Sequence, residues 1–272
     1  MSLPGQTGTN FKQPDKWDCY KFECLSDFLG EYAKSVRQPT GYLEAFAGSN
    51  QSVCAGINCP REACHILKGK ESFFNQIVLL AQSETALAAL RKPLLPARAD
   101  VLSGSLINEE TLQKVLDSFP RSEAVFILLE PPGFHHLRFS SLKKLALRGI
   151  DKDGRKPDML LVLPLEMSLI RNLGRLDCQD SISRFFGHDK WIDIRQDWYT
   201  KRINTEEARK RLLRLYLAGF KDMGYKHVVH KEPANAGSPA RYQLAVVSDR
   251  INFKNILDTI WDKERFLSCE LF

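Results

Sequence analysis

The stretch YKHVVHKEPANAGSPARYQLAVVS, residues 225–248, decides the fold. Two short runs rich in valine flank a connection that is rich in Pro, Gly and Asn. No full helix fits between the two runs, so they predict an antiparallel hairpin that ends the sheet. We expect the second strand of this hairpin to be inserted between neighbouring strands at one end of the sheet.

Upstream of the hairpin, apolar runs of strand length alternate with helical patterns. Strands are predicted in residues 42–46, 75–81, 99–105, 123–130 and 158–166, and helices in residues 19–36, 84–90, 108–119, 140–150 and 205–223, with a further helix beginning at Pro60. Continuous apolar runs indicate parallel strands that are covered on both faces. The sequence therefore predicts an α/β, Rossmann-like doubly wound sheet, mostly parallel with a terminal antiparallel hairpin. Five parallel strands, a helix and a closing hairpin are the arrangement of class I methyltransferases.

Length and composition predict one domain. The chain has 272 residues, of which 43% are hydrophobic and 26% charged, as in an ordinary globular protein. Residues 1–16 are expected to form a flexible lead-in, and 17–272 a single domain with a helical elaboration around 165–223. No apolar run is long enough for a membrane span, and the first residues lack the apolar core of a secretory signal. Seven cysteines without a regular framework suggest reduced thiols in a cytoplasmic protein.

The first candidate site lies where the strand YLEAF runs into AGSN, residues 47–50. Ligands of a doubly wound sheet bind beyond the carboxyl ends of the strands, and small residues there let the backbone approach a ligand closely. An acid at the strand end, Glu44, suits an amino or hydroxyl group, and S-adenosylmethionine offers both. The alternative is a strand that ends in a tight glycine turn. The predicted cofactor residues of this loop are Glu44, Phe46, Ala47, Gly48, Ser49 and Asn50.

The second candidate site is LLEPPG, residues 128–133, at the end of the fourth strand. Proline fixes φ and removes a donor, so the Glu130 side chain is held in place. A carboxylate so placed accepts a hydrogen bond from a nucleophilic amine as the reaction proceeds. The alternative is that the prolines simply end a buried strand. The predicted catalytic residues are Glu130, Pro131, Pro132, Gly133 and Phe134.

The segment 134–156 carries most of the positive charge of the chain. It holds seven Lys or Arg against two Asp, whereas the whole chain has a net charge of +6. We expect Lys144 and Arg148, four residues apart on one helix, to turn outward together. The predicted substrate-binding residues, which would neutralise phosphates of a nucleic acid, are Arg138, Lys144, Arg148, Arg155 and Lys156. An ordinary solvated face is the alternative.

A metal site is not predicted. Cys54, Cys59 and Cys64 are separated by four residues on each side, unlike the two-residue spacing of common zinc sites. Pro60 is expected to begin a helix between them. Small thiols without a ligand role are the better interpretation.

The chain resembles the three-Cys-motif partner (TcmP) family in an ordered set of blocks. These are YLEAFAGSN, NCPREACHIL, FFNQIVLL, FILLEPPGFHHLRF, DMLLVLPLEMSLIRN, FFGHDKW, LYLAGFKDMGYKHVVH and RYQLAVVSDR. The resemblance implies a Rossmann-type, S-adenosylmethionine-dependent methyltransferase that works with a partner protein carrying three cysteines. It also places Ser105 among the cofactor residues, after the third strand.

The chain departs from the TcmP pattern at four positions. Asn50 replaces a second glycine, Ala81 or Gln82 stands where an acid meets the ribose hydroxyls, Ser105 replaces an aspartate, and Glu130 replaces an aspartate. Loss of the ribose acid is expected to weaken cofactor affinity by roughly tenfold to a hundredfold.

Two hypotheses follow. The first is a methyltransferase acting on an amine of a nucleic acid or protein. The second is a non-catalytic, methyltransferase-like partner subunit.

Overall fold

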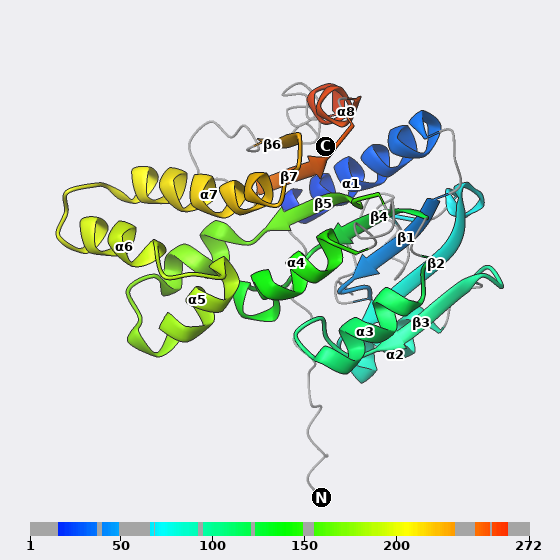
Figure 1. Ribbon diagram of the computed structural model, residues 1–272, viewed down its shortest axis with the longest axis horizontal. Coiled ribbons are helices and arrows are strands. Elements are labelled where there is room, and N and C mark those ends of the chain that lie inside the picture. The colour runs from blue at the N-terminus through cyan, green and yellow to red at the C-terminus, as the bar shows by residue number, and fades with distance from the viewer. Residues whose placement is uncertain are drawn as a thin grey trace, which may run out of the picture.

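Seven strands form one sheet in the order β3-β2-β1-β4-β5-β7-β6. The computed structural model describes residues 16–36, 40–48, 66–67, 69–91, 95–120, 123–148, 155–231, 243–250 and 252–260 (Figure 1). The strands are β1 Thr40–Ala45, β2 Phe74–Ala81, β3 Ala99–Ser103, β4 Ala124–Leu129, β5 Asp158–Leu163, β6 His227–Lys231 and β7 Gln243–Ser248. β1 to β5 pair in parallel, whereas β7 pairs antiparallel with both β5 and β6.

This topology confirms the predicted fold class. The terminal hairpin forms, and its second strand β7 lies between β5 and β6. The chain leaves β3 at one edge of the sheet and returns to β4 beside β1. The strand order therefore reverses between β1 and β4, which is where ligands bind in sheets of this kind.

Helices cover both faces of the sheet (Figure 1). The helices are α1 Lys16–Ser35, α2 Glu84–Leu90, α3 Glu109–Asp117, α4 Phe139–Ala146, α5 Gln179–Phe186, α6 Trp191–Tyr199, α7 Thr205–Asp222 and α8 Asn252–Ile260. Short 3-10 turns occupy Glu71–Phe73, Phe134–His136 and Leu176–Cys178, and a π-helical turn occupies Leu165–Ile170. The apolar sides of α1, α2 and α8 pack on one face, and those of α3, α4, α5 and α7 pack on the other. Every residue of β1, β4, β5 and β7 is buried, as continuous apolar runs predict.

The helices agree with the sequence where capping signals are strong. Asn108 caps α3 through a bond from the Thr111 amide, 3.0 Å, and Asn204 caps α7 in the same way. α5 and α6 lie within the region expected to be a helical elaboration. The C-terminal helix α8 was not among the predicted elements. The helix expected to begin at Pro60 lies outside the described residues.

A buried aspartate joins α1 to the inserted strand. Asp158 of β5 accepts hydrogen bonds from the Tyr32 hydroxyl, 3.2 Å, and the Ser248 hydroxyl, 2.5 Å. Burial raises the pKa of Asp158 above its ordinary value, and the bond from Ser248 opposes that rise. Helix α1, β5 and β7 are thereby connected at the amino end of β5.

Arg148 does not face outward, so that prediction was wrong. α4 ends at Ala146, and helical spacing therefore no longer applies at Arg148. Its guanidinium is buried and donates to the carbonyls of Phe119, 2.9 Å, and Pro120, 3.0 Å. Lys144, which is still inside α4, is exposed and pairs with Glu109.

We predict that Arg148→Met lowers the free energy of unfolding by about 2–4 kcal/mol, because it leaves buried carbonyls without a charged donor. Lys144→Ala, the matched control on the exposed side of α4, should change stability by less than about 0.5 kcal/mol. Urea unfolding of the two variants measures the difference. Equal effects would contradict the structural role of Arg148.

Candidate functional site

The carboxyl ends of four adjacent strands, β1 to β4, lie along one side of the sheet, and the strand order reverses between two of them. The loop 46–48 follows β1, Gln82 follows β2, Ser105 lies two residues beyond β3, and Glu130 follows β4. These positions lie at the same edge because β1 to β4 are parallel and adjacent. The sequence predictions for the cofactor and for the reacting group therefore fall at one site, which we call the carboxyl edge.

The loop after β1 turns sharply against α2. Phe46 and Gly48 both have positive φ, 72° and 71°. A Cβ on Gly48 would lie 2.8 Å from the Ala86 carbonyl oxygen, so glycine is required there by packing as well as by φ. A left-handed conformation at a residue as large as phenylalanine is strained, and such strain concentrates at functional sites. Ser49 and Asn50 lie outside the described residues.

Glu44 is a buried acid with one hydrogen-bond donor close by. Its exposed fraction is 8%, and the Tyr42 hydroxyl donates to Oε2 at 2.7 Å. Burial raises the pKa of Glu44 to about 7, the bond from Tyr42 opposes the rise, and the charge of Glu130 adds to it. Near neutral pH this carboxyl group is therefore present in both forms, one that donates and one that only accepts.

Glu130 is held by a lysine that the sequence analysis did not predict. Lys21 of α1 forms an ion pair with Glu130, and the two side chains are only 9% and 12% exposed. The first part of α1 therefore lies over the carboxyl edge. A lysine in an amphipathic helix is the only sequence signal for this contact, because pairing across 109 positions depends on the tertiary fold.

Gln82 occupies the position expected for the ribose acid. Ala81 is fully buried, whereas Gln82 is partly exposed, so Gln82 is the residue that reaches the edge. Its amide donates to the Ser105 hydroxyl at 3.1 Å. The ends of β2 and β3 are thus joined by two neutral polar groups where the TcmP resemblance implies two acids.

The residues after Glu130 divide between surface and core. Pro131 and Gly133 are buried, and Pro132 is exposed. The Phe134 ring is 2% exposed and packs edge-to-face on Phe185, with centroids 6.3 Å apart. Phe134 therefore supports the turn through its side chain, and the prediction that it faces the reacting group was wrong. Glu130 is the group of this motif whose chemistry suits the predicted role.

The basic segment does not gather at the carboxyl edge. It starts there, but α4 carries it across the sheet, and Arg155 and Lys156 directly precede the amino end of β5. Lys156 pairs with Asp249 at 3.1 Å and lies 4.6 Å from the Tyr225 ring centroid. Of the five predicted residues, only Arg138 lies close in sequence to the Glu130 turn, because the predicted helix leads the chain away from the carboxyl edge to the amino end of β5.

Cys54, Cys59, Cys64 and His65 lie outside the described residues. Within the described ranges, no group of three His, Cys, Asp or Glu is placed to hold a metal ion. Among the same residues, no helix has the length and apolar character of a membrane span.

The topology defines a class I methyltransferase-like fold, with five parallel strands and an inserted antiparallel β7. Similar solved structures include a protein from Legionella pneumophila of the DUF519 family, at 11% identity over 90% of this chain and 92% of that chain, with a TM-score of 0.48. Another is the plantazolicin methyltransferase BpumL with a substrate analogue and SAH, at 9% identity over 85% of each chain and a TM-score of 0.40. A third is the O-methyltransferase TomG from Streptomyces achromogenes with SAM, at 12% identity over 88% of this chain and 93% of that chain, with a TM-score of 0.39.

No protein-family model matches the chain. No curated protein matches it by sequence. Membership of the TcmP family therefore stays a prediction.

Glu44 gives a pH-dependent prediction. An acid whose pKa rises from 4.5 to about 7 on folding binds its proton more tightly in the folded state. The contribution of Glu44 to the free energy of unfolding is therefore fully present below about pH 4.5. It falls by about 3 kcal/mol as the pH rises towards 7. Glu44→Gln keeps an acceptor for Tyr42 and removes the titration.

We expect Glu44→Gln to be more stable than the wild type at pH 8 and similar to it at pH 4.5. Urea unfolding across this range measures the difference between the two proteins. A difference that does not change with pH would show that Glu44 keeps an ordinary pKa.

Proposed function

We propose that the chain binds S-adenosylmethionine at the carboxyl edge and transfers its methyl group to an amine of a nucleic acid or protein. The observation that carries this proposal is a pair of acids, the buried Glu44 and the partly buried Glu130, at adjacent strand ends where the strand order reverses. Carboxyl groups buried at such a position are typical of functional sites.

The residues at this edge fit the cofactor in part. Glu44, in its neutral or charged form, would bind an amino or hydroxyl group, and the tight turn at Gly48 would let the backbone approach it. Gln82 and Ser105 would meet the ribose and adenine side. They hydrogen-bond to each other and carry no charge, so they support weaker binding than two acids would.

The cofactor supplies an electrophilic methyl group. The chain must then orient the attacking amine and accept a hydrogen bond from it, and Glu130 has the acceptor for this. Lys21 forms an ion pair with Glu130 and so fixes the direction of its carboxyl group. Because Lys21 uses one carboxylate oxygen, Oε1, the other oxygen is the one we assign to the amine.

A second candidate function is a non-catalytic, methyltransferase-like partner subunit. The Lys21–Glu130 ion pair and the neutral Gln82 favour it, since both reduce what the edge offers to ligands. In either case we propose a cytoplasmic protein that works with a three-Cys-motif partner, as the TcmP resemblance implies.

Introducing an acid at the position expected to meet the ribose hydroxyls distinguishes the methyltransferase from the non-catalytic partner subunit. We expect the wild type to bind S-adenosylhomocysteine weakly, and Gln82→Glu to bind it roughly tenfold to a hundredfold more tightly, because a charged acceptor replaces an amide. Glu44→Ala should abolish detectable binding. Calorimetric titration at neutral pH measures all three proteins.

Gln196→Glu, on the exposed side of α6, is the matched control and should leave the affinity unchanged. No heat from either the wild type or Gln82→Glu would contradict cofactor binding and favour the partner subunit. Tighter binding by both glutamate variants would show a general charge effect.

A further inference from the structure

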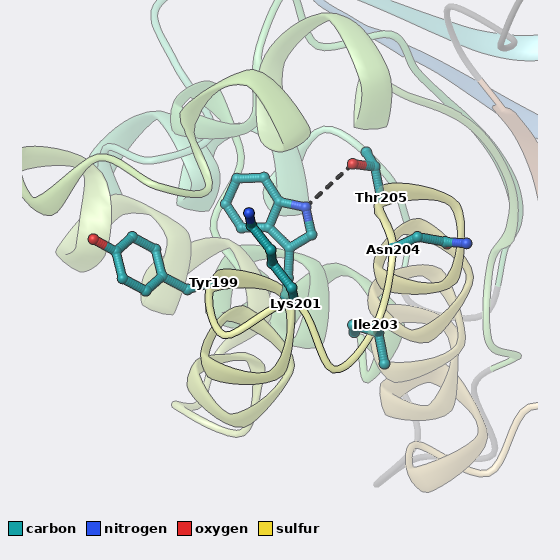
Figure 2. A pocket seen from close by; sticks show the side chains of 6 residues that line it. Tyr199, Lys201, Ile203, Asn204 and Thr205 are labelled. Carbon is teal, nitrogen blue, oxygen red and sulfur yellow. Dashed lines mark hydrogen bonds between the residues drawn. The ribbon is translucent and has the colours of Figure 1, made fainter.

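The corner between α6 and α7 holds a cavity of about 450 Å³ (Figure 2). It is lined by Trp198, Tyr199, Lys201, Ile203, Asn204 and Thr205. This volume is within the range of pockets that bind small molecules. None of the sequence predictions, and no part of the proposed chemistry, uses this cavity.

The lining combines aromatic surface with a cation. Tyr199 is 72% exposed, so its ring is accessible to a ligand. The Trp198 indole N–H donates to the Thr205 hydroxyl at 3.2 Å, the dashed line in Figure 2, and this bond joins the end of α6 to the start of α7. None of the six lining residues is acidic.

Lys201 occupies a position that favours glycine. α6 ends in a Schellman motif, in which the Arg202 amide bonds to the Asp197 carbonyl at 2.8 Å and the Lys201 amide bonds to that of Trp198 at 3.0 Å. The left-handed residue of this motif is Lys201, with φ of 58°, although glycine would adopt this conformation without strain. Strain of this kind suggests a use for the side chain.

A second cation lies beside Tyr199. Arg195 is four residues earlier in α6, so the two side chains are neighbours on the helix surface. Its Nε is buried and has no hydrogen-bond partner among the described residues. The nearby acid Asp197 is already engaged by Arg202 and Arg211, at 3.1 and 3.3 Å. Lys201 lines the cavity, and Arg195 adds a second positive charge beside Tyr199.

The corner belongs to the segment that follows the end of β5. In the chain, α5, α6 and α7 follow β5 and precede β6, and the chain enters them from the carboxyl end of β5 (Figure 1). That is the edge to which Glu130 also belongs. The helices that carry the corner therefore start from the side of the sheet at which Glu130 lies.

We infer that this corner binds a nucleotide unit of a single-stranded nucleic acid, with the base stacked on Tyr199 and its phosphate near Lys201 and Arg195. Exposed aromatic rings between cations are the means by which proteins bind single strands without reading their sequence. In a duplex the base faces are already stacked and unavailable. The inference rests on the proposed function, since it names the substrate class of that same enzyme.

The test is fluorescence polarisation with labelled oligo(dT) and oligo(U) of about 12 nucleotides, and with a duplex of the same length, from about 50 to about 200 mM salt. Tyr199→Ala should weaken single-strand binding by about 5- to 100-fold through loss of stacking. Lys201→Gly should reduce the salt slope by about 0.7 and raise the unfolding temperature by about 2–4 °C, because it removes a phosphate contact and relieves strain. The two labelled strands show whether DNA or RNA is preferred.

Phe73→Ala and Lys221→Ala are matched controls, an exposed ring and an exposed cation away from the corner. No single-strand binding by the wild type at low salt, or equal losses in Tyr199→Ala and Phe73→Ala, would overturn the inference. Equally tight duplex binding that ignores Tyr199 would also overturn it. Titration with S-adenosylhomocysteine distinguishes this inference from cofactor binding. We expect Tyr199→Ala to bind S-adenosylhomocysteine as the wild type does, because single-strand binding and cofactor binding can each be lost while the other is kept.

Discussion

The site depends on two carboxyl groups that lie at neighbouring strand ends, where Glu44 is buried and Glu130 is partly buried. Glu44 ends up 8% exposed, and its negative form is opposed both by burial and by the charge of Glu130. Two ionised acids in such a place are costly unless one is neutral or paired. The protein does both: Glu44 moves towards its neutral form beside Tyr42, and Glu130 pairs with Lys21. Because Lys21 belongs to α1, the electrostatics of the edge and the position of the covering helix are coupled.

This coupling gives α1 a role at both ends. Its first part supplies Lys21 to the carboxyl edge, and its last part supplies Tyr32 to Asp158 at the opposite edge. Asp158 in turn bonds to Ser248 of the inserted strand β7. The helix that covers the candidate site is therefore fixed by the same strand insertion that distinguishes this fold from other doubly wound sheets.

The sequence predicted the sheet better than the surface of the site. Apolar runs and the short hairpin connection are local signals, and the strands they predicted all form. Glu44, Gly48 and Glu130 could be predicted as candidate site residues because they lie at strand ends. Lys21 was missed and Arg148 was misplaced, since each depends on a partner or a helix end that spacing alone does not reveal. The strained Lys201 has no sequence signal either, because only the φ value shows that a lysine takes the place of glycine.

Hydrogen exchange measured by mass spectrometry, with and without S-adenosylhomocysteine, tests the central claim most directly. If the cofactor binds at the carboxyl edge, amides of the loop 46–48, of residues 82–83 and of residues 104–107 should exchange more slowly in its presence, while those of residues 196–205 at the α6–α7 corner should not change. Protection confined to other parts of the chain, or no protection at saturating ligand, would contradict the account.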